Sequence, residues 1–140
     1  MNTSELSTVW APRLLSVLRI VAALIFLEHG TQKLLGFPPS PNPAPAMLSL
    51  SWFAGAIEIV GGTLLALGLF TRPVAFVLSG EMAFAYWIGH APASFYPVLN
   101  RGDAAILYCF VFLYFVFRGP GALSIDGDRR PVEVTEAEEL

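Results

Sequence analysis

The sequence predicts an all-α fold, a transmembrane four-helix bundle with both termini in the cytoplasm. Mean hydropathy is +0.62 and only 14% of the 140 residues are charged, unlike a soluble domain of this size. Four apolar runs alternate with polar or proline-rich connections. Because a helix needs about 20 mainly apolar residues to cross a bilayer, these runs favour membrane spans over buried core helices.

The expected four-span bundle occupies residues 1–124, and a polar, acidic cytoplasmic tail follows at 125–140. Proline suits the first turn of a helix, so Pro12 and Pro73 mark the starts of the first and third spans. The third and fourth runs are short and need flanking residues to complete a crossing. The expected spans are residues 12–35, 48–70, 73–89 and 103–117.

The connections are expected to lie outside the lipid. Residues 36–47 are rich in proline, which excludes a helix and favours an extended, polyproline-like segment. Residues 90–102 contain two prolines and suit an interfacial loop or a short surface helix. The first apolar run ends in charged residues and has no small-residue cleavage site, so we interpret it as a retained helix and not a signal peptide.

The placement of arginine and lysine predicts the orientation, because cytoplasmic loops of membrane proteins are enriched in both. With four spans, both termini share one side of the membrane. Lys33 and Arg101 lie on the opposite side. The side of the termini, which we expect to be cytoplasmic, collects Arg13, Arg72, Arg118, Arg129 and Arg130.

Acids and bases interrupt the apolar runs, and each ionised group at the bilayer centre costs about 2.5–3.5 kcal/mol. These groups are therefore expected to meet one another inside the bundle. At about 100° per residue, one side of the first helix carries Glu28, His29, Gln32 and Lys33.

Glu58 is flanked on its helix face by alanines and glycines, which let a neighbouring backbone approach closely. We therefore expect Glu58 to enter a helix–helix interface and to pair with Lys33, while His29 bridges to a second carboxylate. Glu81 lies on the third helix. The candidate catalytic or proton-handling residues are Glu28, His29, Lys33, Glu58 and Glu81.

A structural role competes with this functional interpretation. Buried charge pairs can serve to fix packing without a net gain in stability, whereas intramembrane ionisable residues are functional by default. With two histidines and one cysteine, a metal site is not expected. The net charge of −3 does not bear on nucleic-acid binding, but the sequence has no basic stripe, so we expect no nucleic-acid partner. We expect Arg19 to extend towards lipid headgroups, His90 to lie at the interface, and Cys109 to pack as a small apolar residue.

Short motifs along almost the whole chain resemble the DoxX family of small bacterial membrane proteins. Residues 29–36 read His-Gly-Thr-Gln-Lys-Leu-Leu-Gly, similar to the family's H-G-x-Q-K-L-F-G. Residues 58–62 and 68–72 are similar to its E-x-x-G-G and G-L-x-T-R. Residues 100–103 read Asn-Arg-Gly-Asp, where the family tends to have N-G-G-E, and residues 119–126 resemble G-P-G-x-x-S-L-D.

The resemblance implies a multi-pass bundle in the bacterial cytoplasmic (inner) membrane and a link to sulfur or thiol redox chemistry. One relative is a subunit of a quinone-reducing thiosulfate oxidoreductase. We therefore expect an oxidoreductase subunit, not a stand-alone enzyme, with a quinone as cofactor. Electrons would come from a soluble oxidoreductase partner, because the chain has no flavin motif, haem-binding pair or cysteine pair. The candidate cofactor-binding residues are His29, Gln32, Lys33, Glu58, Asn100 and Asp103.

Two other functions stay open at this point. The protein could be a non-catalytic scaffold that anchors a soluble partner through its tail or its outer loops, with the polar cluster merely locking the bundle. It could also be a small-solute or proton-coupled transporter working as a homo-oligomer. The chain shows no inverted repeat with broken helices of the kind that transporters use, which disfavours transport.

Overall fold

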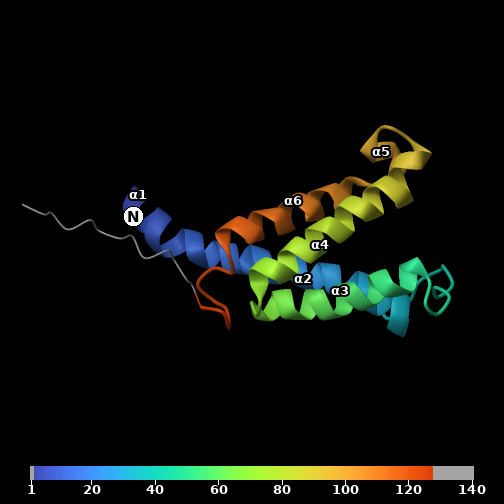
Figure 1. The fold of residues 1–140 in the computed structure, drawn as a ribbon. Helices are drawn as coiled ribbons and strands as arrows, with labels where there is room; N and C mark the ends of the chain where they lie inside the picture. The colour runs from blue at the N-terminus through green and yellow to red at the C-terminus, as the bar shows by residue number, and fades with distance from the viewer. Residues whose placement is uncertain (1, 128–140) are drawn as a thin grey trace, which may run out of the picture.

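Helices make up all the regular structure in the described part of the chain. The structure is a computed structural model that describes residues 2–127, and no strand occurs among them. The all-α prediction is confirmed for these residues. The long helices, which lie side by side in Figure 1, are α2 (Ala11–Leu35), α3 (Leu50–Leu67), α4 (Thr71–Ala85) and α6 (Asp103–Arg118). The short ones are α1 (Thr3–Glu5), η1 (Leu6–Trp10), η2 (Tyr86–His90), η3 (Ala91–Ala93) and α5 (Pro97–Asn100).

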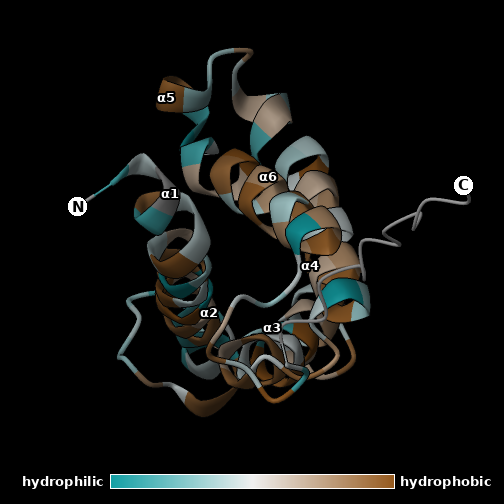
Figure 2. Ribbon diagram, turned by 90° about the vertical axis from the view of Figure 1, so that its left-hand side faces the viewer, coloured by the Kyte–Doolittle hydropathy of each residue, from teal (hydrophilic) through white to brown (hydrophobic). Residues whose placement is uncertain are grey.

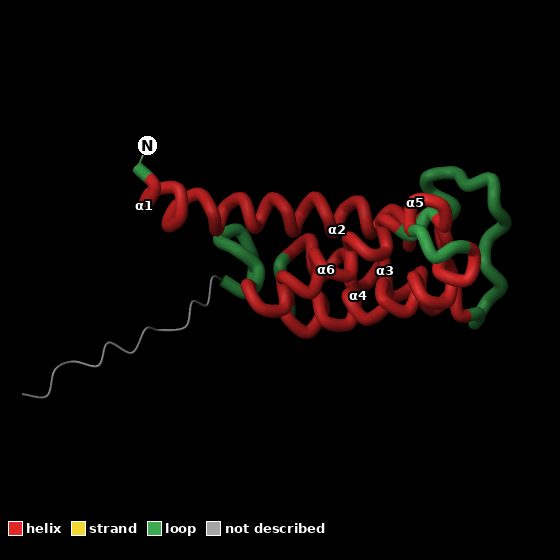
Figure 3. The backbone as a smooth tube through the Cα atoms, turned by 90° about the horizontal axis from the view of Figure 1, so that it is seen from above, coloured by secondary structure: helices red, strands yellow, loops and turns green. Residues whose placement is uncertain are grey.

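The long helices form two pairs. α2 packs along α3, and α4 packs along α6, whereas the contact between α3 and α4 is less extensive. Phe26 of α2 joins the pairs through Tyr108 and Phe112 of α6, with ring centroids 5.4 and 4.9 Å apart. The proline-rich connection and α5 lie at the same end of the molecule (Figure 3), which we call the loop end. The opposite end, where α3 turns into α4, is called the strap end.

The outer surface of the helices carries many exposed apolar side chains, and Figure 2 shows that hydrophobic residues occur along all the long helices. Leu14, Phe76 and Phe110 are 61%, 65% and 65% exposed. Apolar surface on this scale marks contact with a membrane or a partner. Two helical stretches, Leu6–Leu35 and Leu50–Leu67, are long and apolar enough to cross a membrane. With 15 residues in α4 and 16 in α6, the third and fourth spans stay predictions.

Local sequence signals explain where the long helices begin and end. Pro12 lies in the first turn of α2, although helical backbone already starts at Thr3, earlier than predicted. Gly36 ends α2 with a left-handed φ of 67°. Ser49 caps α3 by accepting a hydrogen bond from the Trp52 amide, 3.2 Å away.

Residues 119–127, which we call the strap, fold back over the strap end. The Leu123 amide donates to Ser16 Oγ at 2.9 Å, and Ser16 is fully buried. Gly121 has a φ of 80°, and a Cβ at this position would lie 2.7 Å from the carbonyl oxygen of Pro12. Glycine is therefore required both by the backbone conformation and by the close approach of the strap to α2.

Two further contacts tie the strap end together. The Asp126 carboxylate accepts hydrogen bonds from the amides of Phe70 and Thr71, at 2.9 and 2.8 Å, and so caps the start of α4. Arg72 donates to two carbonyl oxygens in the last turn of α6. These contacts extend beyond residue 125, where the polar tail was expected to begin. Residues 128–140 of that tail lie outside the described residues.

Arg19 is the central side chain of the strap end, and our expectation that it reaches lipid headgroups is wrong. The side chain is 0% exposed. Its guanidinium donates to the carbonyl oxygens of Pro120, Leu65 and Ala66 at 2.8, 2.5 and 2.7 Å, and also to that of Leu123. The planar fork of arginine can serve several acceptors at once, so Arg19 joins α2, the end of α3 and the strap.

Candidate functional site

An ion pair connects α2 and α3 in the half of the molecule nearer the loop end. Lys33 Nζ lies 2.6 Å from Glu58 Oε1, which confirms the predicted pairing. The Glu58 side chain is 3% exposed and that of Lys33 is 32% exposed. Glu58 lies near the middle of α3. Its carboxylate is therefore removed from water by the packing around it, while Lys33 keeps partial access to solvent.

Glycines position this ion pair. A Cβ at Gly30 would lie 2.8 Å from both the Gly55 carbonyl oxygen and Ile59 Cγ1. A Cβ at Gly55 would lie 2.9 Å from Leu34 Cγ. The two backbones approach this closely because neither residue has a side chain. The close approach expected from the small residues around Glu58 is therefore present, and it brings Lys33 within reach of the carboxylate.

Glu81 lies near the middle of the helical stretch formed by α4 and η2. Both of its carboxylate oxygens are buried, and neither has a hydrogen-bond partner among the described residues. Glu58 Oε2 is also buried without such a partner. A buried polar group without a partner costs free energy comparable to a lost hydrogen bond. These three oxygens can therefore accept hydrogen bonds from a ligand or from water. Alternatively, a carboxylate can take up a proton.

A cavity of about 620 Å³ lies beside Glu81, between α3 and α4. We call it the α3–α4 cleft. Most of its lining is apolar, with Phe53 and Phe84 on its walls, and its polar side chains include Lys33, Glu81 and His90. Ligand sites of small molecules have this size and this combination of apolar walls with a few polar groups.

A second cavity of about 670 Å³ lies beneath the proline-rich connection at the loop end. We call it the proline hollow. Its lining includes Gln32, Lys33 and Gly36 at the end of α2, together with Asn42 and Ser49. Lys33 lines both this polar hollow and the α3–α4 cleft. The lysine therefore stands between a polar surface cavity and the apolar cleft that contains Glu81.

Glu28 and His29, the other acid and base predicted on α2, make no hydrogen bond or ion pair with Lys33 or Glu58 among the described residues. The side chains of Glu28 and His29 are exposed. The ring of His29 lies edge-on to Tyr108 of α6, with centroids 6.3 Å apart. The predicted polar arc of α2 is thus divided between two neighbours: Lys33 faces α3, whereas His29 faces α6.

Asn100 and Asp103 lie at the loop end, in and after α5. The Asn100 side chain is buried, donates to the Ser94 carbonyl oxygen at 2.8 Å and accepts from the Gly102 amide at 2.7 Å. These bonds shape the turn into α6. The Asn100 carbonyl oxygen lies 3.0 Å from His90 Nδ1. Asp103 is exposed at the start of α6, so neither predicted side chain lines the α3–α4 cleft.

Comparisons with known proteins agree with the motifs. The family model DoxX matches residues 14–91. An uncharacterised protein of Haemophilus influenzae is 48% identical over 122 residues, covering 84% of this chain and 91% of that protein. Inner membrane protein YphA of Escherichia coli is 29% identical, covering 82% of this chain and 89% of its own length.

An uncharacterised membrane protein of Mycobacterium tuberculosis is 31% identical to the chain, over 78% of this chain and 77% of that protein. No solved structure matches the chain. The family model covers more than half of the residues, and it includes the Lys33–Glu58 pair and Glu81. The chain is therefore a membrane protein that belongs to the DoxX family.

Proposed function

We propose that this protein is the membrane subunit of a quinone-linked redox system that acts in sulfur or thiol chemistry, located in the bacterial cytoplasmic membrane. In this proposal the long helices all cross the bilayer, and η2 extends α4 to complete its crossing. The strap end faces the cytoplasm together with both termini. The arginines at the strap end, Arg13, Arg72 and Arg118, support this orientation.

The observation that carries the proposal is the unpartnered carboxyl group of Glu81 beside an apolar cleft. A quinone ring is apolar on its faces and polar at its two oxygens. Its carbonyl oxygen can accept a hydrogen bond from a protonated carboxyl group, and a quinol hydroxyl can donate to a carboxylate. Glu81 would bind the ring at one oxygen, and Phe53 and Phe84 would cover its faces.

Lys33 and Glu58 would supply a route for protons, because reduction of a quinone takes up protons as well as electrons. Lys33 lines the polar proline hollow, and its ammonium group is bonded to Glu58. The electrons would come from a soluble oxidoreductase partner that docks on the membrane protein. The chain thus contributes binding, orientation and proton exchange at the cleft.

Quinone binding by the purified protein in detergent tests the proposal. Menadione is titrated while the fluorescence of the three tryptophans, Trp10, Trp52 and Trp87, reports its binding. We expect saturable quenching, and an affinity at least about tenfold weaker in Glu81→Gln, which corresponds to about 1.4 kcal/mol. Glu5→Gln, an exposed glutamate on α1, is the matched control and should bind like wild type. Absence of saturable binding, or equal binding in both variants, would reject the proposal.

A further inference from the structure

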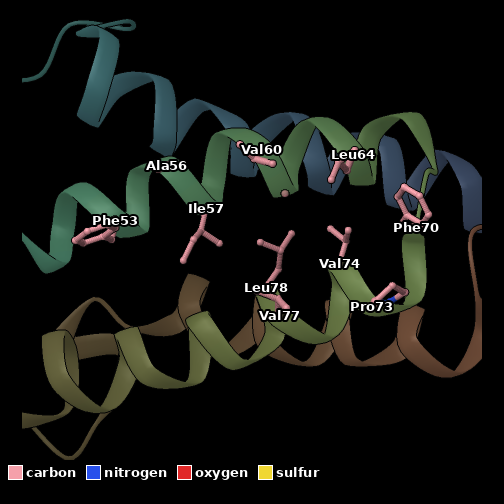
Figure 4. A pocket seen from close by; sticks show the side chains of 11 residues that line it. Phe53, Ala56, Ile57, Val60, Leu64, Phe70, Pro73, Val74, Val77 and Leu78 are labelled. Carbon is pink, nitrogen blue, oxygen red and sulfur yellow. The ribbon is translucent and has the colours of Figure 1, made fainter. Parts of the chain in front are cut away.

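A second apolar cavity lies next to the α3–α4 cleft, on the side of the strap end. It has a volume of about 590 Å³ and is lined by apolar side chains of α3 and α4 (Figure 4). We call it the lower groove. Three residues, Phe53, Ile57 and Val77, line both the lower groove and the α3–α4 cleft. The two cavities are therefore neighbours along the interface of α3 and α4.

The lower groove lies on the outer surface of the helices. Val60 and Phe70, on its lining, are 60% and 62% exposed. Its floor is the close contact of the two helices, where a Cβ at Gly61 would lie 2.6 Å from Leu78 Cδ2. From Phe53 to Leu64 the groove extends roughly 16 Å along α3, at about 1.5 Å per residue. In a bilayer this surface faces the lipid acyl chains, so a ligand would reach it from the lipid and not from water.

The polar and apolar linings of these two neighbouring cavities lie in a definite order along the helices. Glu81 and Lys33 line the α3–α4 cleft, nearer the loop end, whereas the lower groove is lined by apolar side chains and Gly61. An occupant must therefore have a small polar head at mid-membrane depth and an apolar tail that points towards the strap end. A small polar molecule without an apolar tail would occupy only the cleft and would not fill the lower groove.

A phospholipid does not match this arrangement. Its phosphate prefers the helix ends at the membrane surface, whereas Glu81 lies near the middle of its helical stretch. An anionic phosphate in the cleft would also lie beside Glu81, and Lys33 of the cleft is already paired with Glu58. A quinone with an isoprenoid tail has an uncharged head and an apolar tail, and it fits both parts.

We infer that the ligand is a tailed, membrane-resident quinone that enters sideways from the bilayer between α3 and α4. Its ring lies beside Glu81 and its tail lies in the lower groove. The inference depends on the proposed function and adds the substrate class and the direction of entry. α3 packs less extensively against α4 than against α2, and the lower groove is open on this side.

A comparison of tailed and tailless quinones tests the inference. Menadione, which has no tail, and a short-chain menaquinone, which carries an isoprenoid tail, are titrated in the same detergent into wild type, Val60→Trp and Leu67→Trp. Val60 lines the lower groove and not the cleft. Leu67 is an exposed leucine of α3 outside both cavities and provides the control.

We expect wild type to bind the tailed quinone about tenfold more tightly than menadione. Val60→Trp should remove this advantage without changing menadione binding, and Leu67→Trp should change neither. Equal binding of the tailed quinone to Val60→Trp and wild type, with menadione binding still dependent on Glu81, would overturn the inference but not the proposed function. Failure of both quinones to bind would overturn both. The inference would also be overturned if Val60→Trp displaced a bound phospholipid while quinone binding stayed unchanged.

Discussion

Two of the buried polar clusters among the described residues differ in how completely their hydrogen bonds are formed. At the strap end, Arg19 donates to four backbone carbonyl oxygens. Near the middle of α3 and α4, Glu58 keeps one oxygen without a partner and Glu81 keeps two, among the described residues. Satisfied polar groups rigidify a fold, whereas unsatisfied ones leave bonding capacity for something else.

The strap cluster therefore has a structural role, and the middle cluster is the better candidate for function. One exception lies at the strap end, where the buried Thr71 hydroxyl has no partner among the residues described. Its backbone amide is nevertheless bonded to Asp126. The distinction can be tested by substitutions that affect one cluster at a time.

The largest effect is expected from Arg19→Met. The substitution leaves buried carbonyl oxygens of α3 and the strap without a donor, and each costs about 1–3 kcal/mol. We expect a loss of several kcal/mol in stability, measured as a large fall in the thermal unfolding midpoint in detergent. Arg13→Met removes an exposed arginine of the same helix and should change little. Similar midpoints for the two variants would contradict the structural role of Arg19.

The next effect concerns the Lys33–Glu58 pair. Lys33→Met leaves a buried carboxylate without its cation, and we expect a loss of about 1–3 kcal/mol because Lys33 is partly exposed. The double variant Lys33→Met with Glu58→Leu should recover most of the unfolding midpoint, because apolar residues can replace a buried ion pair.

Quinone binding separates a structural pair from a functional one. In the double variant, recovered stability with weakened menadione binding is expected if the pair serves the ligand site. Recovered stability together with wild-type binding would show that the pair serves packing alone.

Gly121→Ala should produce a loss of similar size, about 1–3 kcal/mol, because the added methyl group would clash with α2. Gly127→Ala is a matched control. Both glycines have positive φ, 80° and 71°, but nothing lies within 4 Å of a Cβ at Gly127. The difference between the two unfolding midpoints isolates the contact of the strap with α2. Equal midpoints would mean that the strap can move away at no cost.

Gly30→Ala should also lower stability, by about 1–3 kcal/mol, and should in addition disturb the ion pair. The new Cβ would lie 2.9 Å from Glu58 Cβ, so α2 and α3 must separate slightly. We expect faster modification of Lys33 by an amine-reactive reagent in intact proteoliposomes. Gly80→Ala, on the open side of α4, provides a stability control because nothing lies within 4 Å of its Cβ. Unchanged Lys33 reactivity in Gly30→Ala would contradict the positioning role of this glycine.

The sequence predicts the helices and the Lys33–Glu58 pair well, because both depend on side-chain periodicity. The small residues beside Glu58 indicate a close helix contact, and Lys33 lies on a neighbouring helix at a matching height. The same reasoning assigned Glu28 and His29 to one cluster with Lys33. The polar arc of α2 is wide enough to face two helices, and periodicity alone cannot divide it between α3 and α6.

Other features could not be predicted for physical reasons. The partners of Arg19 are backbone carbonyl oxygens, which every residue carries, so no residue type marks them. The motif at residues 119–126 indicates a structural element. The residues of α2 that it contacts lie about a hundred positions earlier in the chain, so no local pattern marks this contact. The α3–α4 cleft depends on the packing distance between two helices, which apolar patterning does not specify.

The most direct test of the account is an infrared difference spectrum that records the carboxyl groups as menadione is added to the protein. The account predicts a change in a carboxyl band, present in wild type and in Glu5→Gln but absent in Glu81→Gln. An identical spectrum in Glu81→Gln and wild type would contradict the claim that the free oxygens of Glu81 receive the ligand.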